Sequence, residues 1–127
     1  MHARVNLWET ARARLQDAEM LLRSERYDGA VYVCGYAVEI ALKERICRTL
    51  DWPEFPSTKR EFEGLQSFKT HDLDVLLHLS GVEQKIKTER WVEWSNVAAW
   101  NPEARYNPIG SATAAVADKM IQSAKAL

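Results

Sequence analysis

One acidic side chain stands in an unusual place in the sequence. Between Ala30 and Leu42, in the run AVYVCGYAVEIAL, the only charged residue is Glu39. A carboxylate in an apolar environment is costly unless it has a partner, and Lys43 is one helical turn further on. Two interpretations are open. Glu39 either anchors the fold by accepting hydrogen bonds from Lys43, from another helix or from a second copy, or belongs to a polar binding site.

The histidines are the other residues with obvious chemistry. His71 is followed by Asp72, so the two could form an acid–base pair, although a histidine at a helix start more commonly bonds its neighbouring carboxylate or the backbone. His71 and His78 are seven positions apart, about 10 Å along a helix, which is too far to share one zinc ion. No metal site and no cofactor are predicted.

The composition indicates a single domain. The 127 residues are 46% hydrophobic and 28% charged, typical of a globular protein, and lack an apolar window that could span a bilayer. The N-terminus has no continuous apolar segment of a secretory signal, so we expect a cytoplasmic protein. Cys34 and Cys47 are expected to be reduced and to fill the core.

The net charge of -1 gives no field that would attract nucleic acid to the whole molecule. If RNA binds, a local basic patch must do it, and Lys59, Arg60 and Lys69 are the first residues to consider. Trp91, Trp94 and Trp100 have a spacing more typical of core packing than of base stacking.

Apolar spacing predicts the elements that must position these residues. A first amphipathic helix is expected at about residues 3–24, and a second begins near residue 27 with Asp28 as its cap. Because the second helix is apolar on nearly every side, it should be central and buried. Gly35 within it indicates close approach of a neighbouring segment.

The remainder of the chain alternates loops and helices. Residues 51–69 are predicted to form a long loop with at most one short helical turn. The further helices expected are one capped by Thr70 or Asp72 that ends at Gly81, one over 82–100 and one over 111–127. The predicted fold class is all-α, a four- to five-helix antiparallel up-and-down bundle over residues 1–127. We expect a homodimer, since a second copy would complete the burial of the central helix.

Three segments together resemble HEPN domains, which are small helical bundles of bacteria and archaea. They are RYDGAVYVCGYAVEIALKERI, then THDLDVLLHL, then NPEARYNP. HEPN domains are found in toxin–antitoxin pairs, in defence systems and beside minimal nucleotidyltransferases. The resemblance covers residues 11–124. It implies a dimeric all-helical bundle, and a nucleotidyltransferase or antitoxin as partner.

The resemblance also implies a function connected with nucleotides or RNA. Many members are metal-independent RNA endonucleases with an Arg followed, after four to six residues, by a His. Here the positions separated from His71 by four, five and six residues are Gln66, Leu65 and Gly64, and none of them is an arginine. No histidine follows Arg105. The standard ribonuclease pair is therefore absent. We expect a nucleotide- or RNA-associated domain of a toxin–antitoxin or defence module.

Two alternatives remain beside that expectation. One is a divergent metal-independent endoribonuclease, with His71 as base and Arg105 stabilising the pentavalent phosphate during attack by a 2'-hydroxyl. The other is a non-catalytic helical dimerisation or interaction module.

In a binding site Arg105 would hold a phosphate, and Tyr106 would stack on a base or donate its hydroxyl, although Arg105 could equally pair with a carboxylate. The candidate nucleotide- or RNA-binding residues are Tyr36, Glu39, Lys43, Arg105, Tyr106 and Asn107.

Overall fold

The computed structural model describes residues 1–103 and 106–127. Its elements are β1 (His2–Ala3), α1 (Arg4–Arg23), α2 (Tyr27–Leu50), β2 (Glu54–Phe55), η1 (Gln66–Phe68), α3 (Leu73–Ser80), α4 (Glu83–Glu89), α5 (Trp91–Val97), η2 (Pro102–Tyr106) and α6 (Ala114–Ala126). The predicted all-α fold class is confirmed, with a single pair of two-residue strands among the described residues. Across the same residues, no helix combines the length and the apolar character that crossing a bilayer would require.

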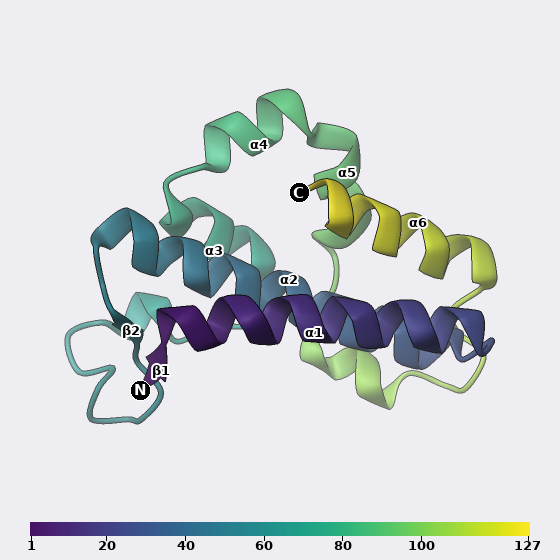
Figure 1. Cartoon of the computed structure of the whole chain (residues 1–127), viewed down its shortest axis with the longest axis horizontal. Helices are drawn as coiled ribbons and strands as arrows, with labels where there is room; N and C mark the ends of the chain where they lie inside the picture. Colours follow the sequence, from purple (N-terminus) through teal and green to yellow (C-terminus); the bar gives the residue numbers. More distant parts are fainter.

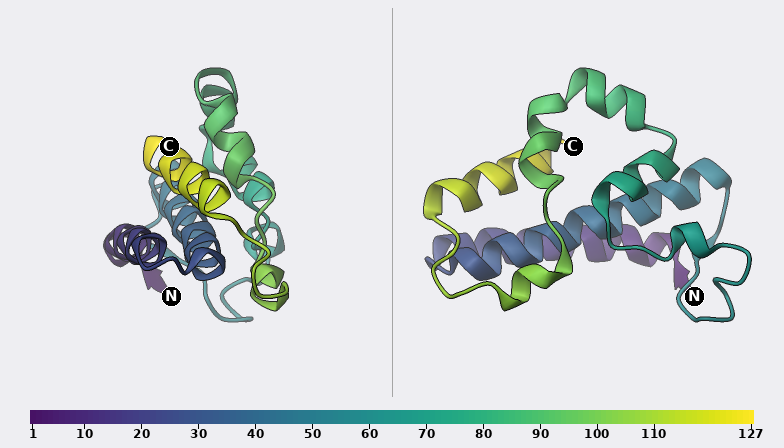
Figure 2. Two further views of the ribbon diagram at one scale, coloured as in Figure 1. Left: turned by 90° about the vertical axis from the view of Figure 1, so that its right-hand side faces the viewer. Right: turned by 180° about the vertical axis from the view of Figure 1, so that it is seen from behind.

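Helix α2 lies at the centre of the molecule, as its sequence predicted. It runs antiparallel to α1, with α3 and η2 on its other side and α6 across it (Figures 1 and 2). Its buried residues point in several directions, including Cys34, Val38, Ile46 and Cys47. Burial raises the pKa of the Cys34 thiol to about 12. The two cysteines are free and buried, which confirms their predicted place in the core.

The start of α2 differs from the prediction, because Asp28 does not cap this helix. The N-cap position is Arg26, without a side-chain hydrogen bond, and Asp28 already lies inside the first turn. Its carboxylate accepts the backbone N–H groups of Gly110, at 2.6 Å, and Ala112, at 2.8 Å. These bonds lower the pKa of Asp28 and tie the segment before α6 to the start of α2.

The predicted long loop after α2 is present and is held at several points. Strand β2 pairs with β1 in antiparallel register, and the backbone N–H of Arg4 donates to the carbonyl of Pro53 at 2.9 Å. Phe55 is buried and contacts the rings of Trp52 and Phe62. Phe55 and Phe62 belong to the main hydrophobic core, so these aromatic contacts attach the loop to it.

The tip of this loop carries two of the predicted basic residues. Lys59 and Arg60 are exposed there, beside Glu61. Burial raises the pKa of Glu61, but hydrogen bonds from Thr58, the terminal ammonium and Ser57 outweigh it and lower the pKa to about 2. The basic pair therefore has an ionised carboxylate as its neighbour.

The helix expected over residues 82–100 is broken in two. Arg90 has φ -134° and ψ 36°, outside the helical region, and α4 and α5 meet there to form an arch above α2 (Figure 1). Helix α4 buries none of its residues, whereas α5 buries Trp94 and Val97. The two helices therefore differ in how deeply they pack against the core. Thr113 caps α6, so this helix begins three residues later than the predicted start at 111.

Candidate functional site

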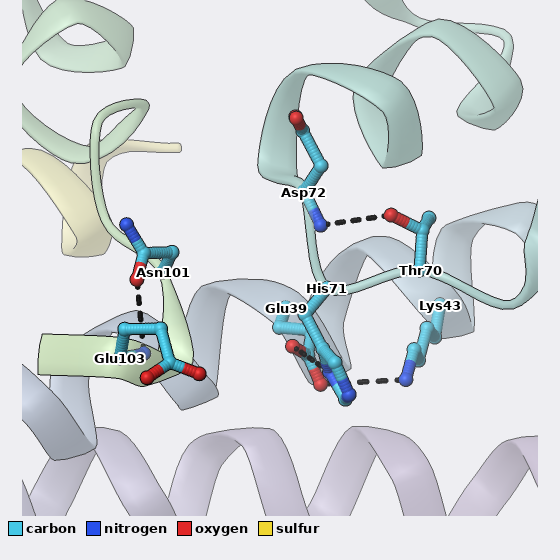
Figure 3. A network of polar contacts seen from close by, with 7 residues as sticks. All are labelled: Glu39, Lys43, Thr70, His71, Asp72, Asn101 and Glu103. Carbon is cyan, nitrogen blue, oxygen red and sulfur yellow. Dashed lines mark hydrogen bonds and ion pairs between the residues drawn. The ribbon is translucent and has the colours of Figure 1, made fainter. Parts of the chain in front are cut away.

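Glu39 lies in the middle of α2 with only 4% of its side chain exposed. Its Oε2 accepts a hydrogen bond from Lys43 Nζ at 3.3 Å, which confirms the partner expected from the sequence. Its Oε1 lies 2.7 Å from Nδ1 of His71, which comes from the segment before α3. Figure 3 shows these three side chains together, and we call them the Glu39 cluster.

The local sequence around His71 explains how it reaches α2. The hydroxyl of Thr70 accepts the backbone N–H of Asp72 at 3.0 Å, which forms a tight turn around His71 (Figure 3). The carboxylate of Asp72 accepts the N–H groups of Asp74 and Val75 and so caps α3, as predicted. The interpretation that His71 bonds its neighbouring carboxylate is wrong, because the Asp72 carboxylate caps α3 and His71 bonds Glu39 instead.

The contact with Glu39 determines which nitrogen of His71 is available. A carboxylate accepts the Nδ1 proton, so Nε2 remains for proton transfer or for a ligand. The His71 side chain is 59% exposed, whereas that of Lys43 is 17% exposed. Lys43 Nζ also lies 5.4 Å from the centroid of the Phe55 ring. One buried carboxylate thus holds two nitrogen groups beside the surface.

An aromatic cluster lies one turn before Glu39 on the same helix. The ring of Tyr36 makes edge contacts with Tyr32, at 5.1 Å between centroids, and with Trp100, at 5.0 Å. Trp100 lies so close to Gly35 that a Cβ atom there would be 2.1 Å from the indole. The close approach predicted at Gly35 is confirmed, and it fixes the chain before η2 against α2.

The late segment 105–107 is placed only in part. Arg105, the predicted phosphate ligand, lies outside the described residues. Tyr106 is 70% exposed at the end of η2. Asn107 makes no hydrogen bond to the Glu39 cluster within the described part of the chain, and it lines a hollow of about 360 Å³ with Trp100 and Asn101. The convergence of this segment on Glu39 stays a prediction.

Core packing is confirmed for two of the three tryptophans considered. Trp94 is buried and its Nε1 donates to Asp74 Oδ1 at 2.9 Å, and Trp100 is also buried. Trp91, the first residue of α5, is 56% exposed, so the core packing predicted for it is wrong. Among residues 1–103 and 106–127, no group of three or more His, Cys, Asp or Glu is placed to hold a metal ion.

The sequence predicted the pairing of Glu39 with Lys43 and drew attention to His71, but it did not predict that His71 bonds Glu39. It also missed Phe55, which lies beneath Lys43. Phe55 belongs to a loop without periodicity, so no pattern indicated its burial. The cost of burying the Glu39 carboxylate indicated that it must have a hydrogen-bond partner. It did not indicate that this partner would be His71 and not another donor.

The HEPN domain family model matches residues 5–58, which include α1, α2 and β2 and cover a little less than half of the chain. The match supports a HEPN family assignment. It contains Glu39 and Lys43, whereas His71 lies beyond it. Comparison with curated proteins and with solved structures gave no match.

Proposed function

We propose that this chain, as a HEPN domain protein, binds nucleotides or RNA in a prokaryotic toxin–antitoxin or defence module. The family match supports a nucleotide- or RNA-associated function in general. The observation that carries the assignment to a site is the contact of the buried Glu39 carboxylate with both Lys43 and His71. The proposed binding site is therefore the Glu39 cluster.

A phosphate group fits the chemistry of this cluster. A protonated histidine donates through both nitrogens, so His71 can donate to Glu39 through Nδ1 and to a phosphate oxygen through Nε2. The Lys43 ammonium supplies a second charge, already held by the same carboxylate. The exposed ring of Tyr106 is the proposed stacking platform for a base, and Arg105 the proposed second phosphate ligand.

Binding is tested with a fluorescently labelled single-stranded RNA and, by calorimetry, with ATP and GTP. The variant His71→Ala should bind about tenfold more weakly or worse, the effect of one lost charge-assisted hydrogen bond. His78→Ala is the matched control, because His78 is also exposed and pairs with Glu83 at 3.3 Å, outside the cluster. No saturable binding by the wild type, or equal losses in both variants, would refute the proposed site.

The Glu39–His71 contact also favours a second candidate, a metal-independent endoribonuclease. His71 Nε2 would take the proton of an RNA 2'-hydroxyl, and the 2'-oxygen would bond to phosphorus as the bond to the 5'-oxygen breaks. The leaving oxygen takes a proton from water, and the resulting hydroxide takes the proton held by His71, which leaves a cyclic phosphate, a 5'-hydroxyl and neutral imidazole. Glu39 would keep Nε2 oriented and stabilise the imidazolium, the role that carboxylates have beside catalytic histidines.

Cleavage of several RNAs by purified protein, with a chelator present, separates the two candidates. The nuclease predicts cyclic-phosphate products that disappear in His71→Ala, diminish in Glu39→Gln and persist in His78→Ala. RNA binding without cleavage would leave the binding role and exclude the nuclease. Cleavage that persists in His71→Ala would assign the activity to another group or to a contaminant.

The proposal includes assembly as a homodimer and a partner of the antitoxin or minimal nucleotidyltransferase kind, both of which follow from the family resemblance. Sedimentation equilibrium of the pure chain tests the first. Copurification with the products of neighbouring genes tests the second. A monomer at all concentrations would refute the homodimer.

A further inference from the structure

A groove of about 560 Å³ lies beside α2, away from the Glu39 cluster. Ala37, Ala41 and Arg45 of α2 line it, and at 100° per residue these positions lie on the helix face opposite to Glu39 and Lys43. Residues of α1, α3, α4, α5 and the end of α6 complete the lining, with the arch of α4 and α5 above α2 (Figure 1). The groove is therefore separate from the site proposed above.

The floor of the groove is apolar. Ala37 and Ala41 of α2 are small and leave space, and Leu15 of α1 and Ile86 of α4 face the same groove. Ile86, the apolar residue of α4, is only partly buried against the core, so part of its surface stays open to the groove. An apolar floor of this size suits the side chains of a ligand better than bulk water.

The walls of the groove concentrate positive charge on a chain whose net charge is -1. Six lining residues are cationic and two, Glu44 and Glu89, are acidic. The cations are Arg12, Arg45, Arg48, Lys85, Arg90 and Lys125. Arg48 pairs with Glu44 at 2.9 Å and Lys125 with Glu19 at 3.7 Å.

The other four cations have no ion pair within residues 1–103 and 106–127. The Nε atom of Arg45 is moreover buried and has no hydrogen-bond partner there. A buried donor without an acceptor is costly, so an acceptor supplied from outside would relieve it. The groove thus combines an apolar floor with unmatched positive charge.

We propose that this groove is the docking site for an acidic amphipathic helix of a partner protein. The apolar face of such a helix would cover the floor, and its carboxylates would pair with the free cations of the walls. A second copy using the same groove would bring like charges together across the symmetry axis. Single-stranded RNA would satisfy the charges but would leave the aliphatic floor without a matching partner.

The test uses a fluorescent peptide with leucines at i, i+3, i+4 and i+7 and glutamates at its flanking positions. The peptide should bind saturably in the micromolar range. A peptide of the same composition with its leucines scrambled, and one with lysines in place of glutamates, should not bind. Competition with single-stranded RNA is measured in the same assay.

Charge-reversal variants locate the binding. Arg12→Glu with Arg90→Glu should weaken peptide binding at least tenfold, because both residues are exposed at the groove. Lys59→Glu with Arg60→Glu makes the same change of charge on the loop after α2 and should leave binding unaltered. His71→Ala should also bind the peptide normally, so that failure of this docking site and failure of the Glu39 site remain distinguishable.

The proposal is overturned if the peptide does not bind, if the scrambled peptide binds equally well, or if the loop control weakens binding as much as the groove variant. It is also overturned if RNA displaces the peptide and itself loses affinity in the groove variant, since RNA would then be the occupant.

Discussion

At the scale of single residues, α2 contains two buried carboxylates in similar surroundings. Glu39 and Glu44 are 3% and 5% exposed, and each pairs with a cation four positions later. Only Glu39 also binds a histidine from another part of the chain. An ion pair within α2 therefore stabilises both buried carboxylates. The contact with His71 distinguishes Glu39, the residue at which chemistry is proposed.

The comparison of these two residues gives a first prediction. Glu39→Gln should lower the free energy of unfolding by about 1–3 kcal/mol, because it leaves the largely buried Lys43 without its charged partner. Glu44→Gln should lower it less, because Arg48 is about half exposed and water can solvate it. Chemical denaturation measures this loss. Only Glu39→Gln should change the nitrogen chemical shifts of the His71 ring. Unchanged His71 shifts would contradict the observed contact.

Gly35 gives a second prediction at this scale. In Gly35→Ala the new methyl would lie 2.1 Å from the Trp100 indole, so helix or tryptophan must move, at a cost of about 1–3 kcal/mol or more. Gly29→Ala is the control, since its methyl would meet only Leu21, at 3.5 Å, and alanine favours a helix. Thermal unfolding with tryptophan fluorescence should show a loss for Gly35→Ala alone. Similar melting of both variants would show that Trp100 does not press on Gly35.

At the scale of elements, α4 is the α-helix with the fewest buried residues. Helix α4 buries none of its residues, whereas α3, of nearly equal length, buries Leu73, Leu76, Leu77 and Ser80. Local opening costs less where few apolar contacts are lost. We predict that hydrogen exchange measured by mass spectrometry is faster in α4 than in α3. Equal protection of both helices would indicate that α4 is already covered in solution.

The bond between Asp28 and the segment before α6 predicts a dependence on pH. Hydrogen bonds from Gly110 and Ala112 lower the pKa of Asp28 below 3.8, so the unfolded chain binds this proton more readily than the folded one. The stabilisation that ionised Asp28 provides is fully present above the unfolded pKa. It is lost as the pH falls through the lower pKa of the folded state. The stability difference between wild type and Asp28→Ala should therefore be constant near neutrality and shrink below about pH 4.

Urea denaturation at several pH values measures that difference. Asp118→Ala is the control, because Asp118 is an exposed residue of α6 without a hydrogen bond or ion pair in the described part of the chain. The stability difference between the wild type and Asp118→Ala should not show this decrease at acid pH. If the stability difference between the wild type and Asp28→Ala grew as the pH fell, it would contradict a carboxylate whose pKa is lowered by folding.

At the scale of the whole molecule, the helices were predictable because apolar spacing reports the face that each one buries. The all-round apolar character of α2 correctly predicted its central position. The break at Arg90 was not predictable, since Ile86 and Trp94 keep a spacing compatible with one helix across it. Strands of two residues, such as β1 and β2, carry no periodic signal at all.

The candidate site was predictable as a set of residues and not as an arrangement. Glu39 and Lys43 share a helix, so their spacing determines their contact. His71 reaches them only through the path of the loop after α2, which is fixed by aromatic contacts and by the turn at Thr70. Such contacts between distant residues leave no mark in local spacing.

The buried thiols provide a prediction for the molecule as a unit. Cys34 is fully buried and its pKa is raised to about 12, so it forms almost no thiolate near neutral pH. Burial also raises the pKa of Cys47. Labelling of both thiols by a disulfide reagent should be slow in the native protein, complete in denaturant, and accelerated by destabilising variants such as Gly35→Ala. Fast labelling of Cys34 in the native state would mean that the core opens locally around α2.

The pairing of β1 with β2 has a consequence for how the chain folds. Helices α1 and α2 are neighbours in sequence, joined by a turn of three residues, and the two short strands close their other end. Bringing them together costs little loop-closure entropy, whereas α3 to α6 reach α2 only across longer intervals. We therefore expect the α1–α2 hairpin to form early in folding, before the arch and the final helix pack onto it.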